Sequence, residues 1–201
     1  MNRLPSDDPA ALRDELRGLL AAHCFSFGDF VLASGQRSSY FYNGKLVTLS
    51  PRGAYLTGRL VFELLRGERI DAIGGKTLGA DPIVTAVALV SALAGEPVPA
   101  FIVRAAQKDH GKQDLIAEAF GPDGAALLGP GRRVAIVDDV ATTGGSLLEA
   151  AAAAEQRGCT VALVAAIVDR QQGAAEAFRA RGYPFRSLFI ADAGGTLSDA
   201  G

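Results

Sequence analysis

The chain has 201 residues and a formal net charge of −2, and 49% of its residues are hydrophobic. This length favours one α/β domain with an appendage, and the hydrophobic content is sufficient for a core. Because the basic residues are scattered and no run approaches the roughly 18 apolar residues that span a bilayer, we expect neither nucleic acid nor a membrane as a partner.

The two cysteines, Cys24 and Cys159, lie far apart in the sequence and lack the spacing of metal ligands. This usage is typical of a reducing cytoplasm, which is where we expect the protein to work. Charged residues within the first 24 positions, among them Asp7, Asp8, Arg13, Asp14, Glu15 and Arg17, lead us to expect no signal peptide there.

The first 50 residues predict a helix followed by two short strands. A capping acid and a proline begin the helix, and its leucines continue at helical spacing to His23. Residues 25–32 and 38–42 are typical of strands. Because these elements precede the main alternating pattern, we predict a small hood of about residues 1–50 over a core of about residues 51–201, within a single domain.

Strands and helices alternate along the rest of the chain. We expect strands at residues 70–73, 100–103, 134–137, 161–168 and 187–190. We expect helices at residues 51–65, at 81–94, from Ser146 onward and at 174–180. Residues 104–131 should be mostly irregular. Such alternation predicts an α/β fold with a central parallel sheet flanked by helices, and ligands bound at the carboxyl ends of the strands.

The most informative stretch is residues 133–146. A buried strand of small and β-branched residues leads to two acids, Asp138 and Asp139, where we expect the strand to end. A Thr-Thr-Gly-Gly run follows, and a helix begins at Ser146. A glycine-bearing turn at a helix N-terminus favours an anion, and the acids suit a ligand that also carries hydroxyls and a divalent cation. The alternative is an ordinary strand-to-helix turn with two solvated acids.

A second glycine-rich loop covers residues 74–82. Its Gly-Lys-Thr segment resembles the end of a nucleotide-triphosphate loop, but that motif requires glycine at position 70, which is Ile70. The loop instead offers exposed N–H groups, with Lys76 and Thr77, for a pyrophosphate. The alternative is a tight turn with Asp81 as helix N-cap and Pro82 in the first turn.

A basic segment follows the strand at residues 100–103. It carries Arg104, Lys108, His110 and Lys112, whose side chains suit a polyanion, and Gly111 allows bending. Long irregular loops in compact domains are commonly functional lids. Beside a phosphate-binding turn, this segment is interpreted as a lid over a leaving pyrophosphate. Taken alone, it would be interpreted as a solvated basic loop.

The turn at residues 138–146 resembles the phosphoribosyl-pyrophosphate loop of type I phosphoribosyltransferases. The resemblance implies the fold of that family. It also implies that phosphoribosyl pyrophosphate is bound by the acids and the turn, together with the second loop: Asp138, Asp139, Val140, Ala141, Thr142, Thr143, Gly144, Gly145, Ser146, Lys76 and Thr77. Mg²⁺ is the implied cofactor, held mainly by substrate oxygens, with Asp138 or Asp139 reaching it through water.

Three further stretches resemble the orotate phosphoribosyltransferases, in the order found in that family. Val-Arg-x-x-x-Lys-Asp-His-Gly at residues 103–111 resembles the catalytic loop, which implies catalytic roles for Arg104, Lys108, Asp109 and His110 and a homodimer in which this loop reaches the neighbouring subunit's site. Residues 30–35, with Ser38 and Tyr40, resemble the hood. Residues 168–173 resemble the segment whose arginine meets the orotate carboxylate, which implies an orotate site of Arg170, Thr142, Phe41 and Tyr42.

Two positions depart from the family pattern. Ala105 stands where many members have a second loop lysine, and Asn43-Gly44-Lys45 stands where many have an acid and an arginine. We expect weakened or redistributed contacts to the leaving group, with activity retained. Two alternatives stay open: a phosphoribosyltransferase for another base, such as a purine or uracil, and a non-catalytic regulator of this fold that senses nucleotides and binds RNA.

Overall fold

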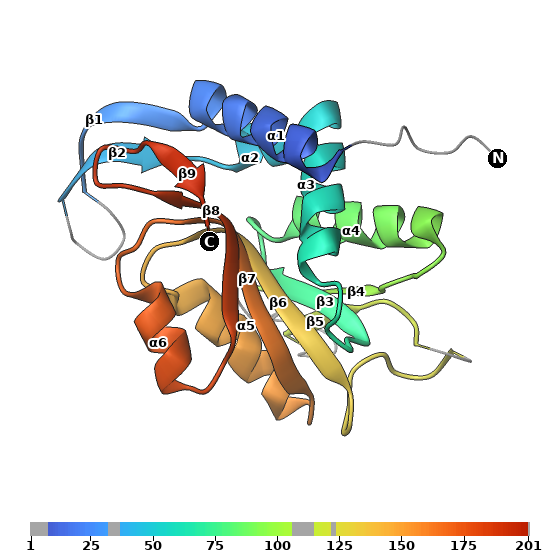
Figure 1. Ribbon diagram of the computed structural model, residues 1–201. Helices are drawn as coiled ribbons and strands as arrows, with labels where there is room; N and C mark the ends of the chain where they lie inside the picture. Colours follow the sequence, from blue (N-terminus) through green and yellow to red (C-terminus); the bar gives the residue numbers. More distant parts are fainter. Residues whose placement is uncertain (1–7, 32–36, 106–114, 122–123, 201) are drawn as a thin grey trace.

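A seven-stranded sheet forms the centre of the computed structural model, which describes residues 8–31, 37–105, 115–121 and 124–200 (Figure 1). Its strands lie in the order β5 (Ile116–Glu118), β4 (Ala100–Val103), β3 (Ala72–Lys76), β6 (Arg133–Ala141), β7 (Thr160–Asp169), β8 (Phe185–Ala191) and β9 (Leu197–Asp199). The five strands from β4 to β8 are parallel, whereas β5 and β9 pair antiparallel at the two edges. The predicted α/β class with a mainly parallel sheet is confirmed.

Helices cover both faces of this sheet. Figure 1 shows α3 (Pro51–Leu64) and α4 (Asp81–Ala94) on one side, and α5 (Gly145–Gln156) and α6 (Ala174–Ala180) on the other. Buried residues form one hydrophobic cluster on each side of the sheet. Residues 134–137 of β6 contribute to both clusters and are at most 1% exposed, and fully burying such a side chain contributes about 1.5–3 kcal/mol.

The hood consists of α1 (Pro9–His23) and an antiparallel pair, β1 (Phe25–Val31) and β2 (Arg37–Tyr42), followed by the short α2 (Lys45–Thr48). Asp8 caps α1 by accepting a hydrogen bond from the N–H of Ala10 at 3.2 Å, as predicted for this helix start. Buried leucines at positions 12, 16 and 20 attach α1 to the α3 side of the core. The hood thereby lies over the carboxyl end of the sheet (Figure 1).

Two local expectations were wrong. The strand expected at residues 70–73 lies at Ala72–Lys76 and includes both Gly74 and Gly75; the ring of Phe101 lies only 2.3 Å from where a Cβ on Gly74 would be, so a larger residue would clash there. Asp81 is the first residue of α4 and not its N-cap, which is Ala80. The described part of residues 104–131 is mostly irregular, as expected, and contains only the short strand β5.

Within the described part of the chain, no helix is both long enough and apolar enough to cross a membrane.

Candidate functional site

A cavity of about 680 Å³ lies at the carboxyl ends of β3, β6 and β7, beneath the hood. The structure brings together here most of the predicted substrate-binding residues: Phe41, Tyr42, Lys76, Thr77, Asp138, Asp139, Val140, Thr142, Thr143, Gly144, Gly145, Ser146 and Arg170. Ala141 is the exception within the turn. It is buried and packs in the α5 side of the core, because successive strand residues face opposite sides of a sheet.

The N-terminus of α5 provides the anion-binding part of the cavity wall. The turn reaches it through Gly144, whose φ of +84° is left-handed and whose added Cβ would lie 2.8 Å from the Phe178 ring. Both observations require glycine at this position. Among the described residues no side chain caps α5. Its first backbone N–H groups and the positive end of its dipole therefore remain for a bound anion.

The two acids differ from expectation in their exposure. They were expected at a solvent-facing strand end, but β6 continues to Ala141, which pairs with Asp169 of β7. Asp138 and Asp139 are consequently only 8% and 5% exposed. Asp138 Oδ1 accepts a hydrogen bond from the N–H of Asp139 at 2.9 Å.

This burial has an electrostatic consequence. Desolvation, reinforced by the adjacent Asp139 carboxylate, raises the pKa of the Asp138 carboxyl well above its ordinary value. The Nζ of Lys45 lies 3.8 Å from Asp139 Oδ2 and is the cation that opposes this effect. The cavity thus holds two adjacent buried acids with Lys45 beside them.

Two glycines make room for these acids. A Cβ on Gly79 would lie 2.2 Å from Asp138 Oδ1, and one on Gly44 would lie 2.7 Å from Asp139 Oδ2. The backbone therefore approaches the carboxylates too closely for a residue with a Cβ, both in the second glycine-rich loop and at the end of the hood. Gly44 belongs to the Asn43-Gly44-Lys45 departure noted in the sequence, so that segment lies at the site.

The second glycine-rich loop contributes a lysine to the cavity wall. Lys76, at the end of β3, forms an ion pair with Glu149 in α5. The neighbouring Thr77 donates its hydroxyl hydrogen to Asp81 Oδ2 at 2.7 Å, which fixes the loop to the start of α4. A ligand phosphate at Lys76 would compete with Glu149 for the ammonium group.

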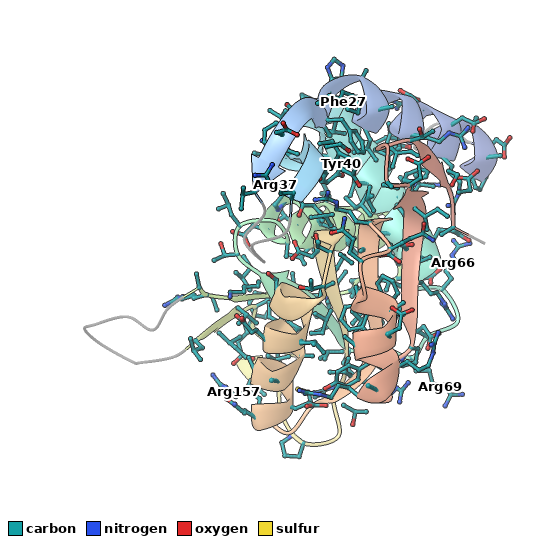
Figure 2. The ribbon with its side chains drawn as sticks, turned by 90° about the vertical axis from the view of Figure 1, so that its left-hand side faces the viewer. Phe27, Arg37, Tyr40, Arg66, Arg69 and Arg157 are labelled. Atoms are coloured by element: carbon teal, nitrogen blue, oxygen red, sulfur yellow. The ribbon has the colours of Figure 1, made fainter. Side chains whose placement is uncertain are left out.

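Arg170 reaches the cavity from the residue after β7, as predicted. Arg170 is only 6% exposed, so it is not a solvated arginine that merely follows a strand. Its Nη2 donates to Ser38 Oγ at 2.8 Å and its Nε to the Tyr40 hydroxyl at 3.1 Å. Figure 2 shows Tyr40 inside the molecule, under the hood strands, whereas Phe27 lies at the outer surface.

Two other predicted orotate-binding residues, Phe41 and Tyr42, are buried to different extents. Phe41 is 47% exposed at the cavity rim, whereas Tyr42 is 6% exposed. Burial raises the pKa of the Tyr42 hydroxyl well above its ordinary value, with the Asp139 charge as the next cause. This hydroxyl has no hydrogen-bond partner among the described residues.

The predicted catalytic loop cannot be placed in the same way. Lys108, Asp109 and His110 lie outside the described residues. The backbone N–H of Arg104 donates to the carbonyl oxygen of Leu115 at 2.8 Å. Arg104 is not among the described residues that line the cavity.

Among the cavity-lining residues that sequence reasoning did not predict, two are charged: Lys45 and Glu149. Lys45 lies in a segment that the sequence marked only as unusual, and Glu149 carried no signal beyond helix propensity. In the described ranges, no group of three or more His, Cys, Asp or Glu side chains is arranged to hold a metal ion.

The comparisons with known proteins agree with this geometry. Residues 80–180 match the phosphoribosyl transferase domain family. An orotate phosphoribosyltransferase from Thermosynechococcus vestitus is 49% identical over 180 residues, which are 90% of this chain and 91% of that protein. One from Rhodopseudomonas palustris is 42% identical over 182 residues, 90% of this chain and 95% of that protein.

Solved structures give the same result. The orotate phosphoribosyltransferase of Mycobacterium tuberculosis in complex with Fe(III) dicitrate has a TM-score of 0.73 at 39% identity, covering 88% of this chain and 94% of that one. The same enzyme in complex with 5-phospho-α-D-ribosyl 1-diphosphate has a TM-score of 0.71 at 34% identity, with 92% and 98% covered. The chain belongs to the orotate phosphoribosyltransferase family.

Proposed function

We propose that the protein transfers the 5-phosphoribosyl group from phosphoribosyl pyrophosphate to orotate, which gives orotidine 5′-monophosphate and pyrophosphate in pyrimidine biosynthesis. One observation carries the proposal: an uncapped helix N-terminus, a buried acid pair and a buried arginine meet in one cavity. These groups match a phosphate, ribose hydroxyls and a carboxylate, respectively. The bound phosphoribosyl pyrophosphate in the M. tuberculosis relative supports the assignment.

In this proposal the 5′-phosphate lies against the turn of residues 142–146. Backbone N–H groups and the hydroxyls of Thr142, Thr143 and Ser146 donate to its oxygens. Asp138 and Asp139 accept hydrogen bonds from the ribose hydroxyls. The pyrophosphate lies at Lys76 and Thr77, and Lys76 exchanges Glu149 for a phosphate oxygen.

Displacement at the ribose C1 by a ring nitrogen builds positive charge on the sugar and negative charge on the leaving pyrophosphate. The carboxylates beneath the ribose stabilise the first charge, and Lys76 stabilises the second. We propose that Arg104, Lys108, Asp109 and His110 complete this site as a lid, and that Lys108 or His110 protonates the pyrophosphate. Arg170 holds the orotate carboxylate, with Thr142, Phe41 and Tyr42 around the base.

The donor set fits a Mg²⁺ ion held mainly by the substrate. Two adjacent carboxylates, one with a raised pKa, offer few direct ligands, so they suit contact with the ion through water. The ion would neutralise charge on the pyrophosphate when bound.

We also propose a homodimer. An apolar groove of about 620 Å³ lies between α2, α3 and α4, and shares Lys45 and Leu78 with the wall of the cavity. Four leucines that line this groove are 60–68% exposed: Leu49, Leu78, Leu89 and Leu93. An exposed apolar patch of this kind marks an interaction site. A second copy seated there would lie close enough to place its lid over the cavity.

The two buried free cysteines, Cys24 and Cys159, support our proposal that the enzyme works in a reducing cytoplasm.

The reaction is tested by measuring pyrophosphate release from phosphoribosyl pyrophosphate with orotate, uracil, hypoxanthine or adenine. We expect release with orotate and formation of orotidine 5′-monophosphate. A preference for another base would contradict the substrate, and no release with any base would favour the nucleotide-sensing regulator.

A further inference from the structure

The hood holds the guanidinium of Arg170 at three points. Nη2 donates to Ser38 Oγ at 2.8 Å, Nε donates to the Tyr40 hydroxyl at 3.1 Å, and the guanidinium carbon lies 4.2 Å from the centre of the Tyr40 ring. Ser38 and Tyr40 are two residues apart on β2, so both face the same side of the hood. More than 125 residues of sequence separate them from Arg170, so the fold alone creates this contact.

The Ser38 hydroxyl is itself fixed in direction. Its Oγ donates to the carbonyl oxygen of Tyr40 at 2.6 Å and also accepts from the backbone N–H of Tyr40 at 3.3 Å. Because its single hydrogen points to the backbone, its oxygen is left to accept from Arg170. The serine therefore serves as an acceptor of defined position.

The backbone of Arg170 is fixed as well. Its N–H donates to the carbonyl oxygen of Ala141 at 2.9 Å, the residue before the phosphate-binding turn. On the next residue, the N–H of Gln171 donates to Asp169 Oδ1 at 2.9 Å. The arginine is thus held at its backbone by the end of the sheet and at its side chain by the hood.

We infer that Ser38 and Tyr40 are positioning residues that set the preference for a base bearing a carboxylate. A guanidinium has five N–H donors in a planar fork. The two hydroxyls take the donors on the Nε side, which directs the Nη1–Nη2 edge to a planar carboxylate for a bidentate pair. This inference rests on the proposed role of Arg170.

Loss of either hydroxyl frees the Nε side of the fork, so the arginine no longer presents one edge only. The base carboxylate then meets a guanidinium that must be ordered during binding, and orotate binds more weakly. The phosphate-binding turn and the acid pair are unchanged, so phosphoribosyl pyrophosphate should bind as before.

The test compares steady-state kinetics of Ser38→Ala and Tyr40→Phe with those of the wild type. Each change removes one hydroxyl while keeping the strand, and Tyr40→Phe also keeps the ring under the guanidinium. We expect the KM for orotate to rise roughly tenfold in each, as for loss of a hydrogen bond to a charged group. The KM for phosphoribosyl pyrophosphate and kcat should stay within about twofold.

Two controls separate positioning from a structural role. Ser39→Ala alters the neighbouring exposed serine, whose Oγ donates to the carbonyl oxygen of Ala193, and should leave both KM values unchanged. Ser38→Thr keeps the hydroxyl and should restore the wild-type KM for orotate.

Arg170→Leu distinguishes failure of this inference from failure of the proposed function. An unchanged KM for orotate in Ser38→Ala and Tyr40→Phe, with orotate use lost in Arg170→Leu, would overturn the inference and leave the proposed function standing. So would an equal rise of both KM values. Normal orotate use in Arg170→Leu would overturn both.

Discussion

Asp138 and Asp139 are two identical side chains that the fold holds buried and in close contact with backbone. Both carboxylates lie within a strand, between close-approaching glycines, with Lys45 at 3.8 Å from Asp139. The rest of the fold must offset the free-energy cost of burying these two acids, which lie where the ribose would bind. Their functional position therefore lowers the stability of the folded protein.

The first prediction concerns the stability of Asp138→Asn without substrate. The pKa of Asp138 is raised in the folded state, so the unfolded state loses the proton first as pH rises, and stability falls between the ordinary carboxyl value of 3.8 and the raised value. The asparagine variant lacks this loss. We expect its melting temperature to exceed that of wild type by about 2–4 °C per kcal/mol gained, and the gain to be larger at pH 8 than at pH 5.

Asp192 offers a control of opposite sign. Backbone hydrogen bonds, first from Thr196, lower the pKa of its exposed carboxyl. The stability that these hydrogen bonds contribute is present at pH values above the ordinary carboxyl pKa and is lost as pH falls through the lowered pKa. Asp192→Asn should therefore be less stable than wild type at neutral pH and equal to it in acid. A gain for Asp138→Asn that did not grow with pH would contradict the assigned pKa direction.

The second prediction concerns binding by the same acids. Replacing both Asp138 and Asp139 with asparagine should weaken phosphoribosyl pyrophosphate binding by at least about tenfold, because charge-assisted hydrogen bonds to ribose hydroxyls become neutral ones. Calorimetric titration measures this affinity directly. Normal affinity in the folded double variant would place the ribose elsewhere.

At the scale of elements, the turn from β6 into α5 has the most constrained geometry of the site. Gly144 takes a left-handed conformation directly against the Phe178 ring, and Gly145 follows it with ordinary backbone angles. Two glycines adjacent in sequence therefore meet different constraints.

The third prediction follows from this difference. Gly144→Ala should destabilise the protein by about 1–3 kcal/mol, since an L residue is strained at positive φ and the new methyl group meets a ring carbon at 2.8 Å. Chemical denaturation measures the loss. Gly145→Ala is the matched control, because its Cβ would meet only Thr143 Oγ1 at 4.0 Å. Equal losses of unfolding free energy in the two variants would contradict this prediction, because they would show that the turn relaxes around the new methyl group.

Elements with strong local patterns could be predicted from the sequence. The continuous apolar run of residues 134–137, the leucine spacing of α1 and the glycine-rich turn each determine their structure locally. The end of β6 could not be predicted, because two acids are typical of a strand end and only pairing with β7 reveals that the strand continues. The short edge strands β5 and β9, three residues each, carry too little pattern to be recognised.

Contacts across long sequence separations escaped prediction for the same reason. The sequence indicated Arg170 as a ligand residue and Ser38 and Tyr40 as part of the hood, but nothing in it joins them. Lys45 and Asp139 likewise meet only through the fold. Residues that bind substrate carry motifs, whereas their supporting partners depend on packing.

At the scale of the whole molecule, hood and sheet share one hydrophobic cluster, which includes Leu16 of α1, Tyr40 of β2 and Ile167 of β7. This supports our proposal of a single domain with a hood of about residues 1–50 and a core of about residues 51–201. The cavity lies where the two parts meet, with walls from both.

The fourth prediction concerns two copies of the molecule. If the lid acts across a dimer, Lys108→Ala subunits mixed with Asp138→Asn/Asp139→Asn subunits should regain part of the activity, because half of the heterodimer sites carry neither change. Each variant alone should be nearly inactive. Leu89→Glu, on the exposed apolar face, should prevent dimerisation and this recovery, as measured by sedimentation. No recovery on mixing would contradict a shared site.

The central claim is that the cavity binds orotate through Arg170 beside the phosphoribosyl site. The most direct measurement is kcat/KM for orotate in Arg170→Leu, together with calorimetric binding of phosphoribosyl pyrophosphate to the same variant. Losing a buried charge-assisted pair costs roughly 2–5 kcal/mol, so we expect a fall of about 30-fold or more with phosphoribosyl pyrophosphate binding retained. Arg170→Lys should raise the KM for orotate, because an ammonium pairs poorly with both carboxylate oxygens. Unchanged orotate kinetics in Arg170→Leu would contradict the claim.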